Sequence, residues 1–150
     1  MISACNSSNQ NSKEAQEAEN QDSEEQVIEE SVEPEPNPIE IEQNSPMDYV
    51  NLANSEVFRS KEGGLFDEDE WSIRGSVYNG AKYCVLSEIV IRVNQYSQNS
   101  VLLKNDTYSI NTFPTNAQSS HPFVIKIDRA ADAETFSIDL IDALLVYGMP

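Results

Sequence analysis

Residues 71–77 read Trp-Ser-Ile-Arg-Gly-Ser-Val, and this short stretch decides the fold class. One face carries Trp71, Ile73, Gly75 and Val77, while serine and arginine fill the alternate positions. Successive side chains of a β-strand point to opposite faces, so this period of two predicts a strand with one buried and one wet face. Asn79-Gly80 follows at once and predicts a turn.

The same alternation recurs towards the C-terminus, with turn signals roughly every 8–15 residues. We expect strands at residues 89–93, 123–127 and 136–140, and one broken strand or two between 101 and 110. Together they predict an all-β fold, a small antiparallel Ig-like β-sandwich over residues 47–150.

Two segments of this domain allow more than one interpretation. Residues 48–59 fit a first strand or a short helix. Residues 139–147 fit a terminal helix, but the β-branched and aromatic residues near their end favour a last strand with a bulge near Asp142.

The first 46 residues differ sharply in composition from the rest. They hold 12 of the 26 acidic residues, one of the nine basic residues, and none of the aromatic ones. Such a segment cannot bury enough apolar surface to offset the entropy of ordering it. We therefore predict a disordered acidic linker over residues 6–46, stiff and extended around its prolines. The formal net charge of −17 also disfavours nucleic acid as a partner.

Ile2-Ser3-Ala4-Cys5 resembles a bacterial lipobox, the end of a lipoprotein signal peptide. In that family the signal is cut before the cysteine, which then carries the lipid. The polar run at residues 6–12 resembles the linker that follows such a cysteine. Residues 1–5 are thus expected to be the remnant of a longer signal, whose basic start and apolar run are missing here. The resemblance implies lipidation of Cys5 and anchoring in a membrane.

The domain resembles the small Ig-like domains of bacterial lipoproteins, such as the FxLYD-type group. The likeness rests on the strand at residues 71–79, the strand at 89–93 and Phe123-x-Ile125. The nearest match to the family's Phe-x-Leu-Tyr-Asp signature is Phe123-Val124-Ile125-Lys126-Ile127-Asp128, which departs from it. The resemblance implies a β-sandwich without enzymatic activity.

The candidate sites in the domain all have simpler structural explanations. The acidic run Asp67–Glu70 is rich in the oxygen ligands that calcium takes, but it has no Gly-centred calcium-loop pattern, so we interpret it as a solvated loop. His121, the only histidine, follows two serines and is expected in a surface loop. Cys84 is expected to be a small buried residue. The remaining candidates are four tyrosines that fit a binding face but are also ordinary strand residues: Tyr78, Tyr83, Tyr96 and Tyr108. We predict no catalytic, cofactor or metal site.

These observations predict a non-enzymatic lipoprotein of the bacterial cell envelope, in the outer membrane and facing the periplasm or the cell surface. Its sandwich would be a binding or accessory module for an envelope protein or an extracellular ligand. The alternative is a structural or assembly subunit that pairs through an exposed strand edge. An enzyme is the third hypothesis.

Overall fold

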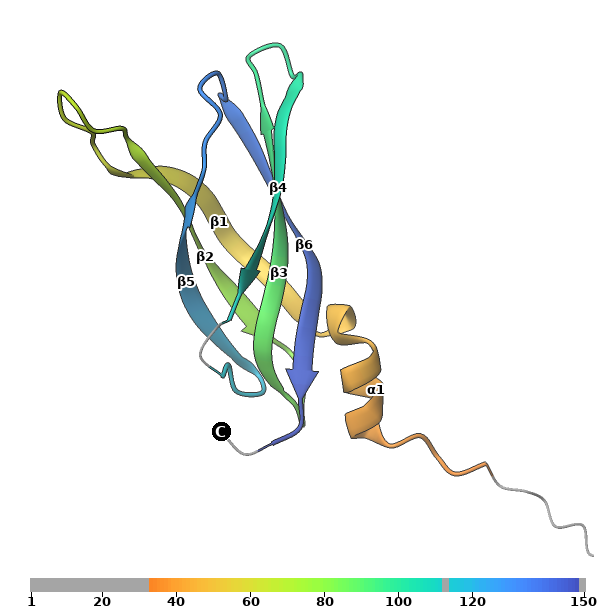
Figure 1. The fold of residues 1–150 in the computed structure, drawn as a ribbon. Coiled ribbons are helices and arrows are strands. Elements are labelled where there is room, and N and C mark those ends of the chain that lie inside the picture. Colours follow the sequence, from red (N-terminus) through yellow and green to blue (C-terminus); the bar gives the residue numbers. More distant parts are fainter. Residues whose placement is uncertain (1–32, 112–113, 149–150) are drawn as a thin grey trace, which may run out of the picture. The chain divides into compact units, whose positions relative to one another are not determined.

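The computed structural model describes residues 33–111 and 114–148, and these form two three-stranded antiparallel sheets (Figure 1). One sheet has the order β1-β2-β5, with β1 at Val50–Lys61, β2 at Glu70–Asn79 and β5 at Ser119–Ile127. The other has the order β4-β3-β6, with β3 at Val85–Tyr96, β4 at Leu102–Ile110 and β6 at Thr135–Val146. The predicted all-β antiparallel sandwich is confirmed.

The core lies between the two central strands, β2 and β3, and follows the period of two that the sequence shows. Ile73 and Val77 of β2 are fully buried, as are Ile89, Ile91 and Val93 of β3. Burial of each such side chain contributes about 1.5–3 kcal/mol to stability. Arg74 and Arg92, at alternate positions of the two strands, are exposed.

Three open points of the sequence interpretation are decided by the strand register. Residues 46–48 form a short 3-10 helix, η1 (Pro46–Asp48), and β1 follows it, so the first-strand interpretation is correct. β4 is a single strand. β6 is a strand rather than a helix, and its register against β3 shifts between Asp142 and Leu140, which confirms the bulge.

A helix that the sequence interpretation did not predict precedes η1. α1 (Pro38–Asn44) lies within the segment expected to be an extended linker, so that expectation is wrong for residues 38–46. Asn37 caps the helix by accepting a hydrogen bond from the Ile39 amide at 3.1 Å, and Pro38 suits the first turn. The compact unit therefore begins at Pro36 rather than at residue 47. Residues 6–32 of the expected linker lie outside the described residues.

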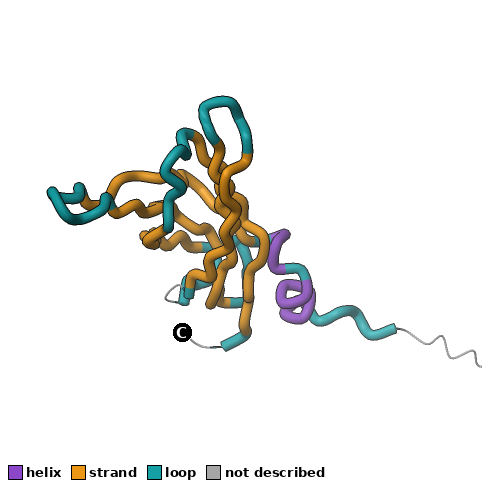
Figure 2. The backbone as a smooth tube through the Cα atoms, turned by 45° about the horizontal axis from the view of Figure 1, so that its top comes forward, coloured by secondary structure: helices purple, strands orange, loops and turns teal. Residues whose placement is uncertain are grey.

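Loops occupy both ends of the sandwich, and α1 packs at one of these ends (Figure 2). At that end Asn79, a fully buried residue, organises the connections. Its side-chain amide donates to the carbonyl oxygens of Cys84 (3.0 Å) and Thr115 (2.9 Å), and its oxygen accepts from the Ala81 amide at 3.0 Å. One side chain thus fixes the β2–β3 loop and ties it to the β4–β5 connection.

Candidate functional site

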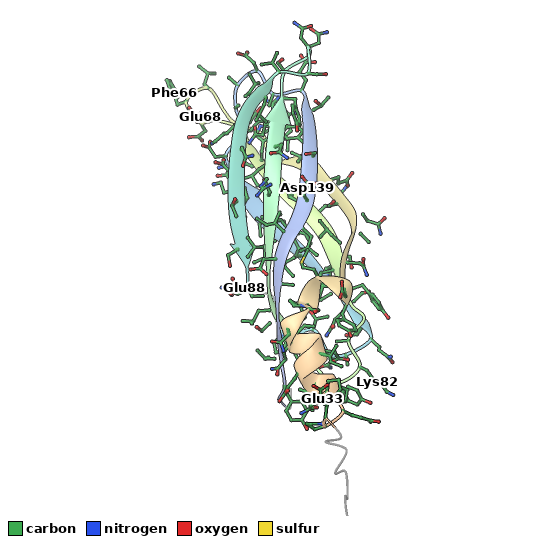
Figure 3. The ribbon with its side chains drawn as sticks, turned by 90° about the vertical axis from the view of Figure 1, so that its right-hand side faces the viewer. Glu33, Phe66, Glu68, Lys82, Glu88 and Asp139 are labelled. Carbon is green, nitrogen blue, oxygen red and sulfur yellow. The ribbon has the colours of Figure 1, made fainter. Side chains whose placement is uncertain are left out.

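The loop between β1 and β2 carries the most exposed large apolar side chains of the described residues. Leu65 and Phe66, which we call the hairpin tip, are 94% and 96% exposed. Figure 3 shows Phe66, with Glu68 nearby, at the far end of the hairpin and away from both sheets. These two side chains contribute nothing to the core, so their apolar surface is available to a partner.

The base of this loop is held by the Asp69 carboxylate. It accepts a hydrogen bond from the Gly63 amide at 2.8 Å and pairs with Arg59 at 3.3 Å. A Cβ atom on Gly63 would lie 2.2 Å from the Asp67 carbonyl oxygen, so the loop can fold back there only with glycine. The Gly63 amide and the Arg59 guanidinium hold the pKa of Asp69 below its ordinary value. The backbone below the hairpin tip is therefore fixed by these contacts.

An open groove of about 740 Å³ lies between this hairpin and the start of the β5–β6 connection. Aromatic rings, cations and carboxylates share its walls, among them Trp71, Tyr108, Lys126, Arg129, Asp67 and Glu70. The Arg129 guanidinium lies over the Trp71 ring, 4.3 Å from its centroid, in cation–π geometry. The groove is thus mixed in charge and mostly polar, and Phe66 of the hairpin tip forms part of its wall.

The side-chain amide of Gln95 in β3 is also buried, and it holds the backbone on either side of Arg129. Its Nε2 donates to the Asp128 carbonyl oxygen at 2.7 Å, and its Oε1 accepts from the Ala130 amide at 2.8 Å. The two bonds bracket Arg129 in sequence. Lys104 of β4 adds an ion pair to the Asp128 carboxylate. This wall of the groove is therefore fixed from the core.

The acidic run predicted from the sequence is divided between the loop and β2. Asp67, Glu68 and Asp69 are exposed in the loop, as expected. Glu70 instead begins β2 and pairs with Lys126 at 3.0 Å. Among the residues that the structure describes, no three His, Cys, Asp or Glu side chains are grouped to hold a metal ion.

His121 corrects the sequence interpretation, because it lies in β5 opposite Val77 and not in a loop. The error arose because Pro122 follows it, and proline is tolerated in β5, which forms the edge of its sheet. Ser120 is its neighbour along the strand, and adjacent strand residues point to opposite faces. The sequence Ser-Ser-His therefore does not bring Ser120 and His121 together.

The four tyrosines do not gather on one face. Tyr78 lies at the end of β2 and Tyr83 in the β2–β3 loop, whereas Tyr96 ends β3 near the opposite end of the sandwich. Tyr108 alone borders the groove, where its hydroxyl accepts a hydrogen bond from the Asp128 amide at 3.3 Å. Their interpretation as ordinary strand residues fits Tyr78, Tyr96 and Tyr108, whereas Tyr83 lies in a loop.

Cys84 is fully buried, as predicted, and Cys5 lies outside the described residues. Burial and the neighbouring Glu42 carboxylate raise the pKa of the Cys84 thiol to about 11, so it is protonated at neutral pH. Glu42 is the buried residue of α1, and sequence reasoning missed its role. The Asn37-Pro38 pair, a common start of a helix, was the available signal.

Comparisons with known protein families, with characterised proteins and with solved structures found no match. No helix of the described residues has the length and apolar character needed to cross a membrane.

Proposed function

We propose that this chain is a non-enzymatic binding module of the bacterial cell envelope, anchored through a lipid on Cys5, which contacts a partner protein through the hairpin tip. The observation that carries the binding role is the near-complete exposure of Leu65 and Phe66. Burying a side chain of this size is favourable by about 1.5–3 kcal/mol, so a partner that covers both gains substantial affinity.

The surroundings of the hairpin tip favour one kind of partner. Asp67 and Glu68 follow it directly and are exposed. A partner with an apolar pocket bordered by basic groups would match this arrangement in shape and in charge. An anionic lipid surface would be repelled by the same carboxylates.

Crosslinking in cells tests the binding role. With a photoreactive phenylalanine analogue in place of Phe66, we expect a single crosslinked product with a foreign envelope protein. The matched control carries the analogue at Val124, which is 64% exposed on β5, far from the tip in sequence. Equal yields at the two positions, or no product at Phe66, would contradict the proposed contact.

The lipid anchor is tested separately by feeding cells radiolabelled palmitate while they express the gene with its own upstream region. We expect the label to enter the chain and to be lost when Cys5 is replaced by serine. An unlabelled wild-type chain would remove the anchor from the proposal and leave the binding role to stand on its own.

Assembly with copies of itself is a second candidate function, favoured by the edge of the second sheet. β4 is an edge strand, and Val101, Leu102 and Leu103 at its start are roughly half exposed. Exposed apolar edges are templates for pairing with another strand. A regular ladder of self-crosslinked products from Leu102 would support this function over recognition of a foreign partner.

A further inference from the structure

The Glu42 carboxylate lies in a pocket made of backbone amides. Its Oε1 accepts a hydrogen bond from the Lys82 amide at 2.7 Å, and its Oε2 accepts from the amides of Tyr83 and Cys84, both at 3.0 Å. The residue is only 4% exposed. Three successive N–H groups that converge on one anion form a nest, an arrangement that binds anions in many proteins.

The loop that provides these amides, residues 80–84, also makes contacts that do not involve Glu42. We call it the receptor loop. The Asn79 side chain bonds to the Ala81 amide and to the Cys84 carbonyl, at the two ends of the loop. The Gly80 amide also donates to the Tyr49 carbonyl oxygen at 2.7 Å. The two ends of the receptor loop are therefore tied to the sandwich by contacts that do not involve Glu42.

α1, in contrast, depends on Glu42 for its position. It has seven residues, far fewer than an isolated helix needs for stability in water. Glu42 is its only buried residue, Ile39 packs partly against the core, and Ile41 on the same helix is exposed. Figure 3 shows α1 at the end of the sandwich opposite Phe66, beside Lys82 of the receptor loop. Segments held by so few contacts open at low cost.

Burial raises the pKa of Glu42, but the three amides and the Cys84 thiol together lower it by more, so its pKa lies below the ordinary value. The carboxylate is thus bound as an anion at neutral pH. A neutral side chain of the same shape would place an amide NH₂ group against backbone donors. The nest therefore selects for a carboxylate.

We propose that the receptor loop is a carboxylate-binding site in its own right and that α1 is a displaceable strap, whose Glu42 fills the site in this structure. The ligand class is a carboxylate, such as an acidic side chain or a chain terminus of a peptide. This inference is independent of the hairpin tip, which lies at the other end of the sandwich.

Cys84 provides a built-in reporter of the strap. Its thiol donates to the Ile39 carbonyl oxygen of α1 at 3.8 Å and is fully buried. In the full chain with Cys5 replaced by serine, we expect Glu42→Gln to speed alkylation of Cys84 by about tenfold or more, because hydrogen bonds to a charged group are among the stronger ones. Amide hydrogen exchange in residues 39–45 should rise in parallel, which a mere change in the reactivity of the thiol would not cause.

Glu40→Gln is the matched control. Glu40 lies on the same helix and is exposed, and its replacement removes the same charge. It should leave both readouts unchanged. Trp71 lies in the groove at the far end of the sandwich, so its fluorescence reports whether the sandwich itself stays folded. An unchanged rate of Cys84 labelling in Glu42→Gln would overturn the proposal that α1 is a strap. So would unfolding of the sandwich, because α1 would then be an integral part of the fold.

A second arm tests the site itself with acetate as the probe. Glu42→Ala removes the carboxylate and leaves room for a small molecule. Sodium acetate should slow hydrogen exchange of the Lys82, Tyr83 and Cys84 amides in this variant, whereas acetamide, or sodium chloride at the same ionic strength, should not. Exchange of these amides that is fast and indifferent to acetate would show that the receptor loop does not bind carboxylates, and would overturn that part of the proposal.

Discussion

Replacing Asn79 with alanine should lower the free energy of unfolding by about 3–5 kcal/mol, since an unsatisfied buried polar group costs about 1–3 kcal/mol. The substitution leaves the Ala81 N–H and the Cys84 carbonyl without the partner that the side chain supplies. The Thr115 carbonyl loses one bond but keeps its bond from the Leu86 amide at 3.0 Å. Urea denaturation followed by Trp71 fluorescence would measure the loss.

The control for this prediction is Asn105→Ala. Asn105 is an exposed amide on β4 that donates to Asn94 at 2.8 Å. Its removal should change stability by no more than about 0.5 kcal/mol, as is usual for surface positions. If the two alanine variants were equally stable, Asn79 could not be the residue that organises this end of the sandwich.

The strands could be predicted from the sequence because each central strand turns one face to the core. In β3 every second residue from Ile89 to Val93 is buried, and in β2 Ile73 and Val77 are buried on either side of the exposed Arg74. The bulge in β6 could be anticipated because Asp142 interrupts an apolar run. These signals are local, so a single sequence contains them.

The residues that hold the ends of the sandwich could not be predicted in the same way. Asn79 and Gln95 occupy core-facing positions, but an asparagine before a glycine also signals a turn, and a glutamine at the end of a strand gives no local sign of what it binds. Glu42 accepts its hydrogen bonds from amides about 40 residues further along the chain. A carboxylate in an acidic segment gives no local sign that it is buried, because only the folded chain brings its donors to it.

The hairpin tip lies between these two cases. Leu65 and Phe66 stand between a pair of glycines and the acidic run, of which residues 67–69 were correctly interpreted as a loop, but the sequence interpretation did not single out these two residues. Two large apolar residues in an otherwise polar loop are the kind of signal that marks a contact with a partner. It was visible in the sequence, although their degree of exposure required the structure.

Replacing Gln95 with alanine should cost about 2–4 kcal/mol, because it truncates a fully buried side chain and leaves the Asp128 carbonyl and the Ala130 amide without this partner. It should also free the backbone around Arg129, so that the guanidinium leaves the Trp71 ring and the fluorescence of the native state changes. Gln98→Ala, at an exposed turn position, should do neither. A Gln95 variant with lowered stability but unchanged native Trp71 emission would show that the groove wall is held by other contacts, such as the Lys104–Asp128 ion pair. The two readouts thus separate a role in folding from a role in shaping the groove.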